Sequence, residues 1–113
     1  MKKVILFSLF VLLVTAFQFC HSSKQAQGAV AKVSYAANVQ PIIQANCSPC
    51  HIAGQGRAKA LNSYDAAKAN IDDMLTRVNK NPGEKDFMPM RHPKLADTTI
   101  AVLARWKESG LAE

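Results

Sequence analysis

The chain has 113 residues, which is enough for one compact domain and no more. Its formal net charge is +6, but from Lys32 onward 11 basic residues stand against 8 acidic ones, which leaves +3. This mild excess, without a dense run of Lys and Arg, excludes the electrostatic footprint of a nucleic-acid-binding domain.

The N-terminus has the layout of a secretory signal. Met1-Lys2-Lys3 precede a nearly unbroken apolar run from Val4 to Phe19. A charged start followed by an apolar segment is typical of export signals, and this run is short for a helix that spans a bilayer. We therefore expect residues 1–19 to be a signal peptide or an N-terminal anchor of an exported protein.

The end of this leader allows several interpretations. Cys20 directly follows the apolar run and resembles the acylated cysteine of a bacterial lipoprotein, although Phe17-Gln18-Phe19 lacks the small residues expected before such a cysteine. Val14-Thr15-Ala16 and Ala29-Val30-Ala31 are ordinary cleavage candidates instead. A lipid anchor at Cys20, a cleaved signal and an uncleaved anchor all stay open, and residues 20–33 are expected to form a polar linker.

Residues 34–113 are expected to form one domain, which begins with a helix. Ser34 can cap this helix, which runs toward Cys47, and Pro41 is expected to bend or restart it because proline lacks a backbone N–H. Its apolar positions are Tyr35, Val39, Ile42 and Ile43.

Two further helices are predicted downstream. One follows Asn62-Ser63 and ends at residues 79–83, where Asn, Pro and Gly gather. The last begins near Asp97 and ends at Gly110, a residue type favoured just past a helix end. No run shows sustained strand alternation, so the sequence predicts an all-α domain.

The densest chemical signal is the run Cys47-Ser48-Pro49-Cys50-His51. Its Cys-x-x-Cys-His spacing is that of a c-type haem attachment site, in which two thiols bond to the haem and the imidazole reaches the iron. A redox dithiol would require a βαβ pattern nearby and a zinc site a second ligand pair, and the sequence has neither. We expect one covalent haem c, held by Cys47 and Cys50, with His51 as an iron ligand.

The chain resembles a class I c-type cytochrome of the small bacterial monohaem type. The resemblance depends on the helix that leads into the motif, on Met88-Pro89 and on a terminal helix with Trp106. It implies a cytochrome c fold of about three to five helices around one haem, with the first and last helices packed together beside it. The contacts expected there are Trp106, Val39, Ile42 and Ile43.

The second axial ligand has four candidates, which are Met88, Met90, His92 and Met74. The resemblance places the distal methionine at Met-Pro, and Pro89 disfavours helical backbone at Met88, which keeps Met88 in an extended loop. Met74 falls on the apolar face of its helix and is expected in the core. Met88 is therefore the predicted ligand, with Met90 and His92 as alternatives.

The loop after the motif departs from the family. Many class I cytochromes have a proline there whose carbonyl orients the proximal histidine, and residues 52–58 contain none. We still expect a backbone carbonyl of this loop to accept a hydrogen bond from His51, because ligating imidazoles nearly always have such a partner. Gly54 and Gly56 indicate a tight loop. Candidates for binding the haem propionates are Arg57, Tyr64, Arg77 and Lys85.

These residues predict an electron carrier and not an enzyme. A His51 and Met88 pair leaves no open coordination site, and thioether ligation raises the reduction potential. The resemblance implies a periplasmic protein, soluble or membrane-anchored, that shuttles electrons between membrane redox complexes such as a quinol:cytochrome c reductase and a terminal oxidase or other reductase. The alternatives are a haem-based ligand-binding or sensory module and a haem subunit of a larger oxidoreductase.

Overall fold

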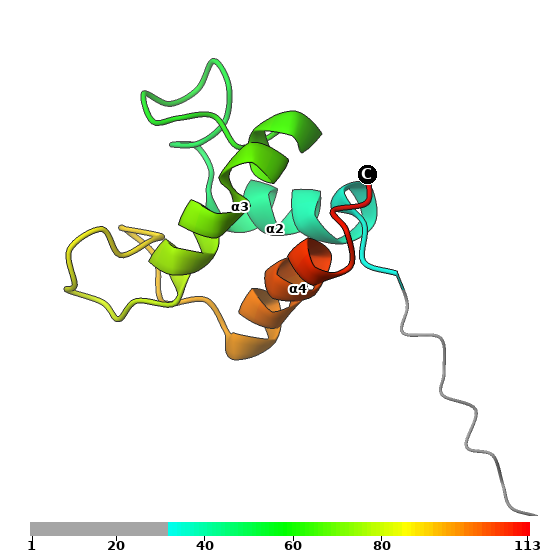
Figure 1. Ribbon diagram of the computed structural model, residues 1–113. Coiled ribbons are helices and arrows are strands. Elements are labelled where there is room, and N and C mark those ends of the chain that lie inside the picture. Colours follow the sequence, from blue (N-terminus) through cyan, green and yellow to red (C-terminus); the bar gives the residue numbers. More distant parts are fainter. Residues whose placement is uncertain (1–31) are drawn as a thin grey trace, which may run out of the picture. The chain divides into compact units, whose positions relative to one another are not determined.

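The computed structural model describes residues 32–113. The expected export segment 1–19, Cys20 and most of the expected linker lie outside the described residues. Within them the chain forms three α-helices and one π-helical turn, with no strand (Figure 1). The prediction of an all-α domain is confirmed for this part of the chain. None of the helices described is long and apolar enough to cross a membrane.

The first helix has two parts. The π-helical turn η2 covers Tyr35–Val39, and α2 continues from it as Gln40–Asn46. The Ser34 side chain caps η2 by accepting a hydrogen bond from the backbone N–H of Ala37 at 3.3 Å. Pro41 lies in the first turn of α2, where backbone N–H groups need no partner within the helix. The predicted cap and the predicted restart at proline are both confirmed.

The other two helices also begin and end where local signals predict. Helix α3 covers Tyr64–Val78, with the Ser63 side chain as its N-cap and Asn79 as its C-cap. Helix α4 covers Asp97–Glu108, and Gly110 follows it with a φ of 93°. This left-handed backbone favours glycine, which has no Cβ to clash with the preceding turn.

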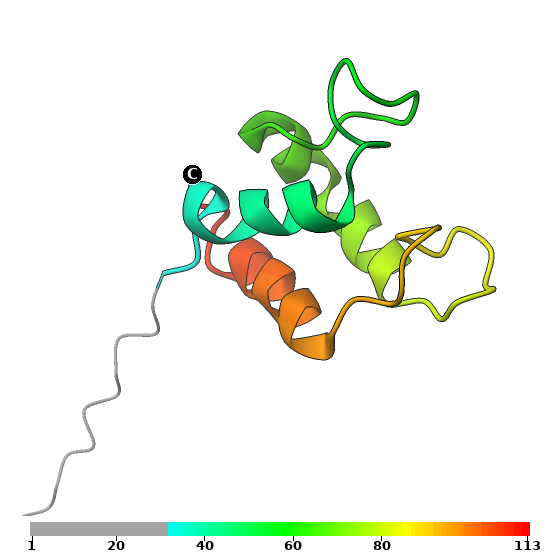
Figure 2. The same cartoon turned by 180° about the vertical axis from the view of Figure 1, so that it is seen from behind.

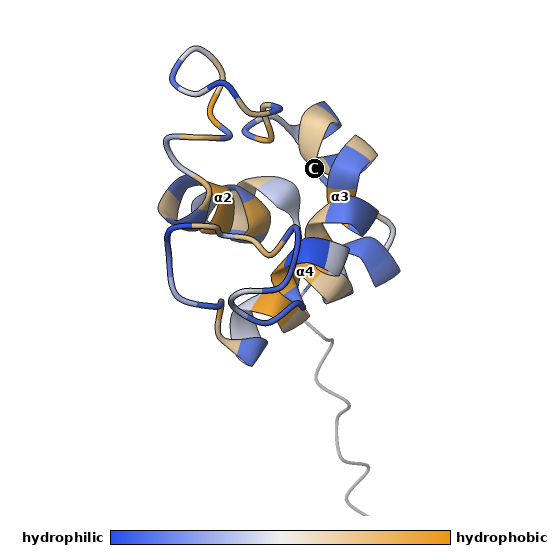
Figure 3. Ribbon diagram, turned by 90° about the vertical axis from the view of Figure 1, so that its left-hand side faces the viewer, coloured by the Kyte–Doolittle hydropathy of each residue, from blue (hydrophilic) through white to orange (hydrophobic). Residues whose placement is uncertain are grey.

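The apolar faces of these elements meet in one core. Helix α4 packs against η2 and against α3, and Figures 1 and 2 show α4 crossing beside the first helix. Figure 3 shows apolar residues gathered on α2 and on part of α4, whereas α3 carries many polar residues. The most deeply buried large side chains are Val39, Ile43, Leu103 and Trp106.

An aromatic cluster joins the two ends of the domain. The Trp106 ring lies 6.0 Å from the ring of Tyr35 and 6.3 Å from that of Tyr64, measured between centroids. The indole N–H of Trp106 donates to the carbonyl of Ala112 at 2.7 Å, and the N–H of Tyr35 donates to the same carbonyl at 2.8 Å. The predicted packing of the last helix against the first is confirmed at η2, and the ring contacts of Trp106 there are with Tyr35 and Tyr64.

Candidate functional site

A cavity of about 750 Å³ lies beside this core. Its walls come from the end of α2, the loop 47–61, one face of α3, the segment 88–92 and Leu103 of α4. This volume is within the range of cofactor pockets, roughly 300–1,000 Å³. The cavity borders all four residues predicted to hold a haem, which are Cys47, Cys50, His51 and Met88.

The end of α2 positions the Cys-x-x-Cys-His motif. The backbone N–H of Cys47 donates to the carbonyl of Ile43 at 2.9 Å, and the N–H of His51 donates to the carbonyl of Cys47 at 2.9 Å. These two bonds continue the helical path by one turn, so that Cys47 and His51 lie one turn apart. Cys47 and His51 are half-buried and Cys50 is exposed. All three reach the cavity.

The cysteines do not have the properties of a redox dithiol. Cys47 and Cys50 are both free, with no disulfide between them. Burial raises the pKa of the Cys47 thiol to about 11, so this thiol is protonated at neutral pH. Reactive dithiols depend on a thiolate stabilised by a lowered pKa, which is the opposite shift. The electrostatics of Cys47 therefore disfavour the dithiol alternative.

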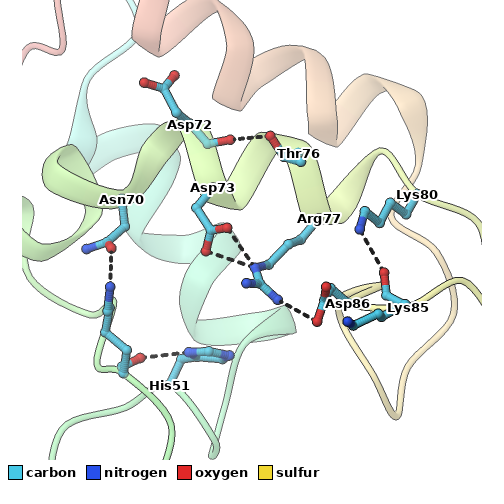
Figure 4. Close-up of polar contacts among 10 residues, drawn as sticks. His51, Asn70, Asp72, Asp73, Thr76, Arg77, Lys80, Lys85 and Asp86 are labelled. Atoms are coloured by element: carbon cyan, nitrogen blue, oxygen red, sulfur yellow. Dashed lines mark hydrogen bonds and ion pairs between the residues drawn. The ribbon is translucent and has the colours of Figure 1, made fainter.

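The imidazole of His51 is held by one short hydrogen bond. Its Nδ1 lies 2.7 Å from the carbonyl oxygen of Lys59 (Figure 4). A carbonyl can only accept, so in the neutral imidazole Nδ1 carries the hydrogen and Nε2 has the free lone pair. This tautomer is the one that a histidine needs to ligate a metal through Nε2. The free Nε2 of His51 is thus the nitrogen available to a ligand.

The partner of His51 differs slightly from the prediction. We expected a carbonyl within residues 52–58, and the acceptor is Lys59, one residue further on. The N–H of Leu61 donates to the carbonyl of His51 at 2.8 Å, which closes the loop and brings residue 59 back beside the ring. The expected type of partner is present, but loop closure decides which carbonyl takes this position.

Gly56 allows this loop to fold tightly against the motif. A Cβ atom at Gly56 would lie 2.1 Å from the carbonyl oxygen of Cys50, a distance at which atoms collide. Only glycine therefore fits at this close approach of two backbone segments. The prediction of a tight loop is confirmed at this position.

The candidates for the second axial ligand all border the cavity, and their exposure separates them. Met88 is half-buried, and its backbone N–H donates to the carbonyl of Arg77 at 3.3 Å. Met90 is 72% exposed, and His92 is exposed as well. Met74 is 7% exposed and belongs to the apolar core, as expected. Its partial burial and its backbone bond to Arg77 favour Met88 over Met90 and His92 as the second ligand.

Two of the four candidates for binding propionates do not border the cavity. Tyr64 donates its hydroxyl hydrogen to the carbonyl of Leu111 at 2.9 Å, in the aromatic cluster, and Lys85 is not part of the cavity wall. The structure therefore brings neither of these two candidates to the cavity. Arg57 and Arg77 do border the cavity.

The face of α3 toward the cavity carries polar residues that sequence reasoning largely missed. The guanidinium of Arg77 donates to both carboxylate oxygens of Asp73, at 2.9 and 2.8 Å, and pairs with Asp86 at 3.5 Å. Chiefly the hydrogen bond to Asp73 raises the pKa of Arg77. The amine of Lys59 donates to the amide oxygen of Asn70 at 2.9 Å (Figure 4). Only the helical spacing of Asn70, Asp73 and Arg77 signals this face.

Comparisons of the chain with protein-family models, with curated proteins and with solved structures found no match. A proposed function therefore has to depend on the residues of the chain and on the geometry of the cavity. That geometry joins a Cys-x-x-Cys-His motif, an oriented imidazole and a half-buried methionine at one cavity.

Proposed function

We propose that residues 34–113 form a monohaem cytochrome c that transfers single electrons through one covalently attached haem c. The observation that carries this proposal is the hydrogen bond from Nδ1 of His51 to the carbonyl of Lys59 at 2.7 Å. This bond leaves Nε2 of His51 free, and the thiols of Cys47 and Cys50 in the same motif border the same cavity.

The residues around the cavity fit such a group. Cys47 and Cys50 would hold it covalently, and His51 and Met88 would be its two axial ligands. When bound, the haem iron supplies a one-electron redox couple whose potential rises with thioether ligation. The apolar wall would shield the ring from water, and its side chains include Ile43, Leu61, Met74, Val78, Leu95 and Leu103.

The protein's own contribution is to hold two ligands in place and to close the site. His51 is oriented by its carbonyl partner, and Met88 is fixed through its backbone to the end of α3. With both axial positions filled by side chains, no open position would remain for a gas or a peroxide. This favours an electron carrier over a ligand-binding or sensory module.

The charges beside the cavity suggest how such a carrier meets its partners. Arg57, Lys59 and Arg91 are exposed at the cavity wall, whereas the carboxylate of Asp73 is paired with Arg77. We infer docking onto acidic faces of membrane redox complexes, where complementary charge increases the rate of encounter. The donor and acceptor classes proposed are a quinol:cytochrome c reductase and a terminal oxidase or other reductase, in the periplasm.

Spectroscopy of the exported and matured protein tests the proposal. We expect haem that stays with the chain after denaturing extraction, a low-spin spectrum in both oxidation states, and the weak far-red band of methionine bound to ferric iron. The reduced protein should bind carbon monoxide poorly at neutral pH. Haem that is lost on extraction would overturn the proposal, and rapid binding of carbon monoxide would favour the ligand-binding alternative.

A further inference from the structure

The face of α3 toward the cavity is connected to both loops that carry the axial ligands. Asn70, Asp73 and Arg77 follow each other at spacings of three and four, so they lie on one side of the helix, and all three border the cavity. Figures 1 and 2 show the two loops leaving from opposite ends of α3. We propose that this face holds the two ligands separately, with Asn70 positioning His51 through Lys59 and Arg77 positioning Met88 through Asp86.

The connection to His51 passes through both ends of Lys59. The carbonyl of Lys59 accepts from the imidazole at 2.7 Å, and its amine donates to the amide oxygen of Asn70 at 2.9 Å. The amide nitrogen of Asn70 in turn donates to the carbonyl of Ala66 at 2.7 Å, which fixes the orientation of the amide. No proline stiffens residues 52–61. The side-chain contact of Lys59 with α3 therefore adds a restraint on this carbonyl, beside the backbone bond from Leu61 to His51 that closes the loop.

The connection to Met88 depends on Arg77. The carbonyl of Arg77 accepts from the N–H of Met88, and its guanidinium pairs with Asp86, two residues earlier in the loop. The Nε–H of the same guanidinium is shared between the two carboxylate oxygens of Asp73, at 2.9 and 2.8 Å, which restrains the direction of the side chain. Asp86 has a φ of 66°, a left-handed backbone that costs energy for a residue other than glycine and persists only where its surroundings hold it.

These contacts are suited to positioning ligands and not to stabilising the fold. The side chains of Arg77 and Asp86 are 33% and 47% exposed, and ion pairs with this exposure contribute little to global stability. A lost contact should therefore change how one ligand is held while the domain stays folded. The proposal rests on the proposed haem function, because it assigns a role toward the two ligands of that haem.

Two variants separate the two connections. Asp86→Asn removes the charge that pairs with Arg77 and keeps a residue type that tolerates a left-handed φ. Asn70→Leu removes the acceptor for Lys59 and leaves the charge of Lys59 in place. Asp86→Asn should weaken the far-red methionine band and speed carbon monoxide binding by roughly tenfold, which is the lower end of effects seen for such supporting residues. Asn70→Leu should keep that band and raise the midpoint potential, since a less firmly bonded imidazole is less basic.

Amide hydrogen exchange gives a second readout that does not depend on electron transfer. Asp86→Asn should speed exchange in residues 84–92 and not in residues 57–61, and Asn70→Leu should do the reverse. Asn70→Asp retains an oxygen acceptor for Lys59 and should restore slow exchange in residues 57–61. The matched control is Asp72→Asn, also on α3 but away from the cavity, which removes the carboxylate charge paired at 2.5 Å with Lys107 of α4. It should leave both ligand signatures unchanged.

The outcomes distinguish this proposal from the function on which it rests. If both variants shift both signatures together, or if neither shifts either, the proposal of separate positioning is overturned while the protein remains a cytochrome. If the wild-type protein carries no covalent haem, the proposed function fails and this proposal fails with it.

Discussion

The loops that carry the two ligand candidates are held in different ways. In residues 47–61, backbone groups of the loop itself make the main bonds, and the partner of His51 is eight positions away. Residues 79–96 also have backbone bonds, among them that from the N–H of Met88 to the carbonyl of Arg77. Charged side chains hold this loop as well, through Arg77 with Asp86 and through Lys94, whose amine donates to the carbonyl of Asn79 at 3.2 Å. The Met88 loop therefore combines backbone bonds with exposed ion pairs, whereas His51 is held by a carbonyl of its own loop.

The two loops should differ in how readily they open. Backbone hydrogen bonds around a close glycine contact resist both salt and thermal opening, whereas exposed ion pairs are screened by salt and open readily. We expect the Met88 loop to open before the loop of His51.

The largest effect is expected at the proximal ligand. His51→Ala removes the imidazole whose Nδ1 is bonded to Lys59, and the matured protein should lose nearly all covalent haem. Haem staining on a denaturing gel measures this directly. His92→Ala, an exposed histidine at the same cavity, serves as the control and should stain like wild type. Normal staining of His51→Ala would contradict the assigned role.

The distal ligand should affect the potential but not attachment. Met88→Ala should keep covalent haem, lose the far-red band and lower the midpoint potential on the order of 0.1 V or more, since axial ligands set haem potentials over about 0.8 V. Spectroelectrochemical titration provides the measurement. Met90→Ala should resemble wild type, because Met90 is 72% exposed. An unchanged spectrum in Met88→Ala would transfer the role to Met90 or His92.

The close approach of Gly56 to the backbone of Cys50 should affect the free energy of unfolding. Gly56→Ala places a Cβ 2.1 Å from the carbonyl oxygen of Cys50, so the backbone must shift. We expect the free energy of unfolding to fall by about 1–3 kcal/mol, as in other overpacked sites. Denaturant unfolding measures it, with the exposed neighbour Gln55→Ala as control. Equal stability of both variants would show that this loop is looser than the structure indicates.

The smallest effect is expected from salt. Raising ionic strength from about 0.1 M to 1 M shortens the screening length from about 10 Å to 3 Å, which weakens the pair of Arg77 with Asp86. Amide exchange in residues 84–92 should become faster, while exchange at Leu61, whose N–H is bonded to His51, should stay the same. Equal acceleration in the two loops would erase the contrast between them.

Local sequence signals predicted most of the helical fold. Ser34, Ser63, Pro41 and Gly110 mark helix ends because each acts through its own backbone or through a side chain within three residues. The Cys-x-x-Cys-His motif can also be recognised in the sequence, because its residues are close together along the chain. Such features need no knowledge of the tertiary structure.

Contacts between residues far apart in the sequence could not be predicted as well. Tyr64 and Lys85 have side chains suited to binding propionates, but neither borders the cavity, because packing directs Tyr64 toward the C-terminal segment. The polar residues Asn70, Asp73 and Asp86 were not singled out. Their side chains are ordinary surface types, and only the fold brings them to the ligand loops.

Local patterns along the chain are sufficient to predict the helical class of the domain, its helix boundaries and the residues proposed to hold a haem. Only in the folded domain does one cavity border all of these residues, does the carbonyl of Lys59 orient His51, and does α3 contact both loops. Every residue carries a backbone carbonyl, so sequence alone cannot indicate which one will face the imidazole. Loop closure and packing against α3 make that choice.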